Sequence, residues 1–294
     1  MAEITNFPYG ISVLGVPVFG GPGDISGSTY FVDNNSGSDS NDGSSWEAAF
    51  KTLAKAIAIS NADIARGSDR WARRNKIFYC ADTETATLVA FPNKCDVIGC
   101  GSYDANSMPG ITGNHAPVNA GNYGTRFINV WFKGPAVAAP LVTLASTSSG
   151  IQFIGCVFSC HASTTRAILT TASPFLKVLN CRFEGAAATA YISFGAGEAG
   201  GTVIQGNDMV DGVAGIICGS ATATWRGLIK GNFIQCSGKF IDTGATSVFN
   251  VVDNTCISAA ALGSSSYVID LTFAVGNRVT GNDVSATIPV IPAS

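Results

Sequence analysis

A four-residue motif recurs along most of the chain at nearly constant spacing, and this repeat limits the possible folds more than any other feature. Its first position holds Val, Ile or Phe and its third holds Gly, Asn or Asp in all eight copies, which are Val97–Cys100, Phe127–Val130, Phe153–Cys156, Val178–Cys181, Ile204–Asn207, Ile229–Asn232, Val251–Asn254 and Val279–Asn282. The seven steps cover 182 residues, an average of 26 residues a step. A fixed period of this length predicts a solenoid, in which each turn buries its apolar face against its neighbours.

The residue types within the motif predict a strand followed by a bend. Gly, Asn and Asp accept a left-handed backbone more readily than other residues, so the third position is expected to turn the chain. The fourth position and the one two residues later share the parity of inward-facing strand residues. The fourth position is predicted to form a buried ladder of Cys100, Val130, Cys156, Cys181, Asn207, Asn232, Asn254 and Asn282, whose amides hydrogen-bond from turn to turn. The second inward column includes Phe132, Phe158 and Phe183, which are expected to stack.

These features predict an all-β fold, a right-handed single-stranded parallel β-helix of about eight or more coils. The composition agrees, because 46% apolar residues are too many for a disordered chain and 34 glycines too many for a helical bundle. From Tyr30 to Leu53 a β-rich start, a polar Gly/Asp/Asn run and an amphipathic pattern follow one another. This segment resembles the opening of pectate-lyase-like β-helix proteins, and the resemblance covers about residues 29 to 286. It implies architecture rather than activity, because the same stem serves lyases, glycosidases, phage tailspikes and inert virion parts.

The chain divides into four expected parts. Residues 1–28 are predicted to form an extended apolar arm, 29–75 an opening strand, polar loop and N-terminal capping α-helix, 76–288 the β-helix stem, and 289–294 a tail where Pro289 and Pro292 stop strand pairing. A capping box at Ser44–Glu47 is expected to start the helix, whose apolar face would hold Trp46, Phe50, Leu53 and Ile57. Residues 102–126 are expected to form a long loop between the first two coils.

The arm is too apolar to stay in water and too short to make a core of its own. Its apolar residues are Phe7, Tyr9, Ile11, Val13, Leu14, Val16, Val18 and Phe19. It is expected either to fold against its own stem or, as the sharper interpretation, to dock on another subunit or a larger shell. The arm also resembles the start of small structural proteins of tailed bacteriophages.

Charge and cysteine content restrict the partners and the compartment. The net charge is −3, from 17 basic and 20 acidic residues, so neither nucleic acid nor a membrane is an expected partner. The sequence lacks a basic leader followed by an apolar run, so we expect a soluble protein made inside a cell. Nine cysteines without paired spacing indicate buried free thiols rather than a zinc site, and no metal or cofactor is expected.

No convincing catalytic set emerges from the outward-facing positions. The column next to the ladder runs through Trp131, Val157, Arg182, Asp208, Phe233, Thr255 and Asp283, in which Arg182 and Asp208 are expected to form a surface ion pair. The loop from Asp33 to Asp42 has the acid density of a calcium site, but Asx turns explain it better. His115 and His161 are expected to be satisfied loop residues. Candidate interface residues are Trp131, Phe233, Arg70, Arg73 and Arg74; outward Trp131 and Phe233, and Trp225, could pack against another stem or stack on sugars.

The leading functional hypothesis is a non-enzymatic capsid decoration or cement protein of a tailed phage. It would be a homotrimer on the capsid surface, assembled in the host cytoplasm, and its arm would contact the major capsid protein. The alternative is a tailspike or tail fibre protein that binds or cuts host-surface polysaccharide. A receptor-binding module without hydrolysis is a third option.

Overall fold

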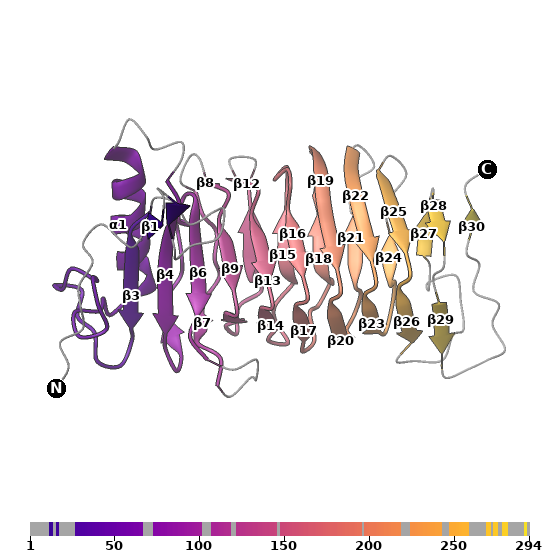
Figure 1. Cartoon of the computed structure of the whole chain (residues 1–294). Helices are drawn as coiled ribbons and strands as arrows, with labels where there is room; N and C mark the ends of the chain where they lie inside the picture. Colours follow the sequence, from indigo (N-terminus) through magenta and orange to yellow (C-terminus); the bar gives the residue numbers. More distant parts are fainter. Residues whose placement is uncertain are drawn as a thin grey trace.

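The chain forms a parallel β-solenoid of the right-handed type, seen from the side in the computed structural model of Figure 1. The structure describes residues 12–13, 16–17, 27–66, 73–101, 107–118, 122–145, 148–195, 197–218, 224–242, 247–258, 269–271, 273–275, 278–281 and 291–292. Strands follow one another along a single axis, from β3 beside the helix to β30 at the opposite end (Figure 1). The predicted all-β parallel fold is therefore confirmed.

Three parallel sheets run along the solenoid. The first sheet contains β3 (Thr29–Asp33), β4 (Asn75–Cys80), β6 (Cys95–Gly99), β9 (Arg126–Ile128), β13 (Gln152–Ile154), β16 (Lys177–Leu179), β19 (Glu198–Gln205), β22 (Thr224–Lys230), β25 (Val248–Val252) and β28 (Phe273–Val275). The second sheet contains β5 (Glu84–Thr85), β7 (Gly110–Thr112), β10 (Trp131–Lys133), β14 (Val157–Ser159), β17 (Arg182–Glu184), β20 (Asp208–Gly212), β23 (Phe233–Cys236), β26 (Thr255–Ser258) and β29 (Arg278–Gly281). The third sheet contains β11 (Val142–Leu144), β15 (Arg166–Thr170), β18 (Ala190–Phe194), β21 (Ile216–Cys218), β24 (Ile241–Asp242), β27 (Ile269–Leu271) and β30 (Ile291–Pro292).

Seven consecutive turns, from β9 to β30, each place one strand in every sheet, against the eight or more coils expected. The motif lies in the first sheet, where the first residues of seven copies pair in register: Val97, Phe127, Phe153, Val178, Ile204, Ile229 and Val251. The predicted left-handed bend occurs at the third position of six copies, with φ between 52° and 67° at Asn129, Gly155, Asn180, Gly206, Gly231 and Asp253. The repeat thus fixes both the register and the corners.

The first copy departs from this pattern. Gly99 does not take a positive φ, and β6 continues through it in register with Tyr79 of β4. Because the strand does not bend, its alternation carries Cys100 to the outer face, where the thiol is half-buried. The assignment of Cys100 to the buried ladder is therefore wrong.

The last copy of the motif does not lie in the first sheet, so its predicted place in the column is wrong. Val279 pairs with Cys256 in the second sheet, whereas the partner of Val251 in the first sheet is Ala274. In the sequence, Gly276-Asn277 continues the Gly-Asn pattern at the position that Gly281-Asn282 was expected to hold. Asn282 itself lies outside the described residues.

The ladder is confirmed from Val130 to Asn254, and its Cys and Asn members make equivalent bonds. Nδ2 of Asn207 donates to the carbonyl oxygen of Val178 one turn back at 3.0 Å, and Sγ of Cys181 donates to the corresponding oxygen of Phe153 at 3.4 Å. The amides add a second link, because Nδ2 of Asn207 also donates to Oδ1 of Asn232 at 2.8 Å. All of these ladder side chains are buried. Cysteine and asparagine therefore both fit this column, because both are small and both donate to the previous turn.

Aromatic rings fill the interior beside the ladder. The rings of Phe132, Phe158 and Phe183 stack from turn to turn, with centroids 5.1 and 4.8 Å apart and interplanar angles of 10° and 7°. Phe127 and Phe153 stack in the same way on the first sheet, and Phe132 meets Phe127 edge-on at 5.4 Å. The predicted aromatic stack is confirmed, and it joins two of the three sheets.

The only helix of the described residues, α1 (Leu53–Arg66), starts later than predicted. Oγ1 of Thr52 accepts the Lys55 amide at 3.2 Å, so Thr52 is the N-cap, while Ser45 closes a separate turn by accepting the Ala48 amide at 3.2 Å. Glu84 of β5 also accepts the Leu53 amide. The helix buries Leu53, Ala56, Ile57 and Ile64, and Figure 1 shows it at the end of the stack beside β3. Trp46 precedes the helix and remains 44% exposed.

Two other expected boundaries change. The expected loop 102–126 contains β7, which pairs with β5 and β10, and β8 (Asn122–Tyr123), which pairs with β12 (Ser148–Ser149). Pro292 lies in β30, which pairs with β27 as the edge strand of the third sheet, so the tail adds a strand where none was predicted. In the arm, β1 (Ser12–Val13) and β2 (Val16–Pro17) pair antiparallel, and its other predicted docking residues lie outside the described residues.

Candidate binding pocket on the outer face

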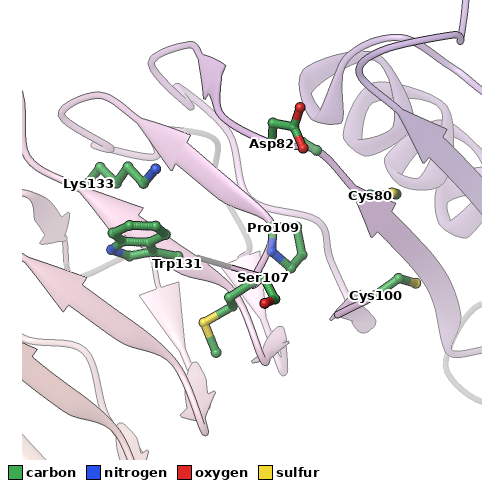
Figure 2. Close-up of a pocket in the computed structure, with 9 residues that line it drawn as sticks. Cys80, Asp82, Cys100, Ser107, Pro109, Trp131 and Lys133 are labelled. Atoms are coloured by element: carbon green, nitrogen blue, oxygen red, sulfur yellow. The ribbon is translucent and has the colours of Figure 1, made fainter. Parts of the chain in front are cut away.

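A pocket of about 320 Å³ opens on the outer face of the solenoid where the first and second sheets meet (Figure 2). Side chains from strand ends and from the segment before β7 surround it. Its lining consists of Cys80, Ala81, Asp82, Cys100, Ser107, Met108, Pro109, Trp131 and Lys133. Cys100 lines the pocket because β6 runs on through Gly99 instead of bending, which leaves Cys100 on the outside.

Trp131 and Lys133 give the pocket its aromatic and its basic group. Both lie on β10, two residues apart, so strand alternation points them to the same outer face. Nζ of Lys133 sits 3.5 Å from the centroid of the Trp131 ring and donates to Oγ1 of Thr83 at 2.7 Å. Burial lowers the pKa of the Lys133 ammonium group below its ordinary value. The cation and the ring therefore hold each other in place at the mouth of the pocket.

A chain of polar contacts extends from Trp131 across the second sheet. Nε1 of Trp131 donates to Oγ of Ser159 at 2.6 Å, and this hydroxyl donates to Oε1 of Glu184 at 2.5 Å. Nε of Arg182 pairs with Oε2 of the same carboxylate at 3.1 Å. Because every member is bonded, this chain of contacts fixes the orientation of the indole.

The two thiols at the pocket differ from the other cysteines. All nine cysteines are free, as predicted, and seven are buried, whereas Cys80 and Cys100 are partly exposed. The pKa of the Cys80 thiol is raised, mainly by burial and to a smaller extent by the charges of Asp33 and Asp82. The pKa of the Cys100 thiol is also raised, mainly by burial and to a smaller extent by the charge of the neighbouring Cys80.

Sequence reasoning found Trp131 but missed the rest of the pocket. Phe233 lies in the same outward column four strands away, so it does not contribute to this site. Lys133 could have been found by extending the alternation from Trp131, and Cys80 by the same rule from the buried Ile77 and Tyr79. The contribution of the segment 107–109 has no sequence signal, because it depends on how that segment crosses the strand ends.

Three of the arginines singled out in the sequence, Arg73, Arg74 and Arg182, have acidic partners within the chain. Arg73 pairs with Asp63 at 3.2 Å, and Arg74 and Arg126 both pair with Asp96. Burial raises the pKa of Asp96, but the hydrogen bonds and charges of the two guanidinium groups outweigh it and the pKa is lowered. Arg70 lies outside the described residues. Arg182 pairs with Glu184 instead of Asp208, although Arg182 and Asp208 are neighbours in register, so the predicted ion pair is wrong.

The acidic loop after β3 uses its carboxylates to hold its own backbone. Oδ1 of Asp33 accepts the amides of Asn35 and Ser36, and Oδ1 of Asp42 accepts the amide of Ser44 at 2.9 Å. Oδ1 of Asp39 accepts the amides of Lys51 and Thr52. The contacts of Asp33 and Asp42 are the Asx turns expected as the alternative to calcium, whereas Asp39 ties the loop to the residues just before α1. In the part of the chain that the structure describes, no group of three or more His, Cys, Asp or Glu side chains could hold a metal.

Two predictions about single residues are wrong. His115 is fully buried rather than a loop residue; its Nδ1 accepts the Leu88 amide at 3.2 Å, its ring meets Phe132 edge-on, and its Nε2 has no partner. Burial lowers the pKa of His115 to about 4. Trp225 is also fully buried, 4.7 Å from Phe194 between ring centroids, so it cannot belong to an outer stripe. His161 is an exposed loop residue, as predicted, and accepts the Ser163 amide.

Comparison with protein-family models, curated proteins and solved structures gives no significant match. The fold therefore stands on the geometry of the chain alone. Among the described residues, no helix has the length and apolar character needed to span a membrane.

Proposed function

We propose that this chain is a non-enzymatic structural protein of a tailed-phage virion, a capsid decoration protein that assembles as a trimer and binds the shell through its arm. The observation that carries the proposal is the continuous interior. Ladder residues that donate to the previous turn link every turn from β9 to β25, and stacked rings add to them, so the solenoid has a continuous bonded interior along its axis. A rod of this kind suits a scaffold, and the apolar sequence of residues 1–28 supplies a segment that gains by burial against a partner.

The stabilising mechanism is thermodynamic linkage. A protein that binds only the assembled shell lowers the free energy of that state, and many weak contacts spread over capsomer junctions add up. In this proposal α1 closes one end of the rod and the arm extends from it.

Mass spectrometry of purified particles tests this function. The proposal predicts many copies per particle, and it predicts that deleting residues 1–28 removes the protein from the particles while the solenoid remains folded. Absence from particles, or a few copies only, would refute the decoration role. The Asn250→Ala variant is the matched control, because this exposed side chain lies on the solenoid outside the arm and the variant should be incorporated like the natural protein.

The pocket favours a second candidate function, the binding of a host-surface glycan at the tail. Trp131 offers an apolar ring edge, and the Lys133 ammonium group beside it could pair with the carboxylate of an acidic sugar. Glycoside hydrolysis needs two carboxylates facing the bond that breaks, and Asp82 is the one carboxylate among the nine lining residues. The pocket geometry therefore favours binding over hydrolysis.

A glycan array decides between the two candidates. If the pocket binds sugar, Trp131→Ala should lower the affinity more than tenfold, while Phe233→Ala, in the same outward column but four strands away, should leave it unchanged. No binding to any acidic glycan, or an equal loss in both variants, would refute the glycan role.

A further inference from the structure

Cys80 and Cys100 are neighbours on adjacent turns. Cys80 is the last residue of β4, and Cys100 follows the last residue of β6, Gly99, which pairs with Tyr79. The amide of Cys100 donates to the carbonyl of Tyr79 at 2.8 Å, which extends the ladder of hydrogen bonds to this position. Adjacent strands lie about 4.8 Å apart. This spacing is within the range of about 4.4 to 6.8 Å that disulfides span between Cα atoms.

Both thiols can be reached from solvent. They are partly exposed and both line the pocket, and Figure 2 shows them at the ends of neighbouring strands. The seven other cysteines are buried. A pocket of about 320 Å³ is large enough to admit part of a small disulfide reagent to these two sulfur atoms.

We propose that Cys80 and Cys100 form a redox-active dithiol that a low-molecular-weight disulfide, such as oxidised glutathione, converts to an intramolecular disulfide. One thiolate attacks the reagent, whose S–S bond breaks; a mixed disulfide forms and one glutathione leaves. The second thiolate then attacks the protein sulfur of the mixed disulfide and releases the second glutathione. Two protein thiols and one oxidised glutathione thus give one protein disulfide and two reduced glutathiones, which take up the two protons.

The fold contains its own comparison pair. Cys156 and Cys181 occupy adjacent turns of the ladder, but both are buried, and their thiols donate to carbonyl oxygens of the previous turn. Adjacency alone would let both pairs oxidise, whereas access from the pocket selects Cys80 and Cys100. The new bond would close a 20-residue loop and tie two turns together near the helix end of the rod.

On a particle that leaves the reducing host cytoplasm, this bond would form after release. That consequence rests on the proposed function, whereas the oxidation itself does not, so failure of one leaves the other standing.

The test is oxidation of the folded full chain. The protein is incubated with oxidised glutathione and then unfolded in denaturant that contains N-ethylmaleimide, which blocks the remaining thiols. It is then digested and analysed by mass spectrometry. We expect a peptide pair linked through Cys80 and Cys100, with the seven other cysteines alkylated. Because the pKa of both thiols is raised, the rate should increase about tenfold from pH 7 to pH 8. The melting temperature should rise on oxidation and fall back with dithiothreitol.

Serine variants separate closure from simple modification. Cys80→Ser and Cys100→Ser should each stop at a mixed disulfide on the remaining cysteine, with no rise in melting temperature. Two stable mixed disulfides on the natural chain would overturn the proposal, as would a link between Cys156 and Cys181 or full alkylation of Cys80 and Cys100. The linked peptide of the natural chain decides the question even if a variant fails to fold.

Discussion

Replacing Asn232 by alanine tests the ladder at its centre. Nδ2 of Asn232 donates to the carbonyl of Ile204 at 3.1 Å and to Oδ1 of Asn254 at 2.8 Å. Its Oδ1 accepts the backbone amide of Asn207 at 3.0 Å and Nδ2 of Asn207 at 2.8 Å. Asn232→Ala therefore removes four hydrogen bonds that link three successive turns.

The expected loss of stability follows from the number of hydrogen bonds removed and from the polar group that is left without a partner. A hydrogen bond contributes about 1 kcal/mol net, so four bonds account for about 4 kcal/mol of the free energy of unfolding. The variant also leaves the buried backbone amide of Asn207 without a partner, which adds about 1 to 2 kcal/mol to the loss of stability. Asn232→Cys should cost less, because Cys181 shows that a thiol at this position keeps the bond to the previous turn.

Urea unfolding followed by circular dichroism measures these differences. The matched control is Asn250→Ala, an exposed asparagine on the neighbouring strand β25, which should change the free energy of unfolding by less than about 0.5 kcal/mol. If Asn232→Ala were as harmless as the control, the ladder would not be a stabilising element and the reasoning would fail.

Three further predictions concern the bends, the buried histidine and the helix. Gly155 has φ of 58°, and a Cβ added there would meet open space, so Gly155→Ala should lower the free energy of unfolding, measured in urea, by about 1 kcal/mol. Gly155→Asn should lower it less, because Asn129 and Asn180 occupy equivalent bends, and equal losses would contradict this reasoning. The pKa of His115 is about 4 in the folded chain and about 6.5 in the unfolded chain, so the free energy of unfolding should fall by up to about 3 kcal/mol as the pH drops from 6.5 to 4. If a His115→Leu variant lost stability with the same dependence on pH, the histidine would not be the cause. Thr52→Ala should cost about 1 kcal/mol by thermal unfolding, while Ser45→Ala, outside α1, should cost less.

The architecture could be predicted because the chain repeats the same residue types at equivalent positions of each turn. Val, Ile or Phe at the first motif position and Gly, Asn or Asp at the third gave the register of seven strands and six bends. The errors occur where the repeat is broken or ambiguous. At Cys100 a glycine in the bend position keeps an extended backbone, and near the C-terminus two Gly-Asn pairs, at 276–277 and 281–282, compete for one position.

Local signals failed where tertiary contacts decide. The Ser44–Glu47 pattern has the form of a capping box, but the helix begins at Leu53, whose amide is bound by the distant Glu84, while Asp39 binds the amides of the two residues before it. The pocket was predictable in part, since alternation places Trp131 and Lys133 outside. Residues 107–109 complete its lining, and no periodicity describes the path of that segment.

Strands about 26 residues apart in the sequence lie one strand spacing apart in the solenoid, and the distance between two spin labels tests this arrangement most directly. Gln152 and Asn250 are 98 residues apart in sequence but four strand steps apart along the first sheet. With genetically encoded labels, which leave the nine cysteines unmodified, pulsed electron paramagnetic resonance should give a backbone separation of about 19 Å. A distance several times longer, or a broad distribution without a maximum, would contradict the solenoid and the functions proposed for it.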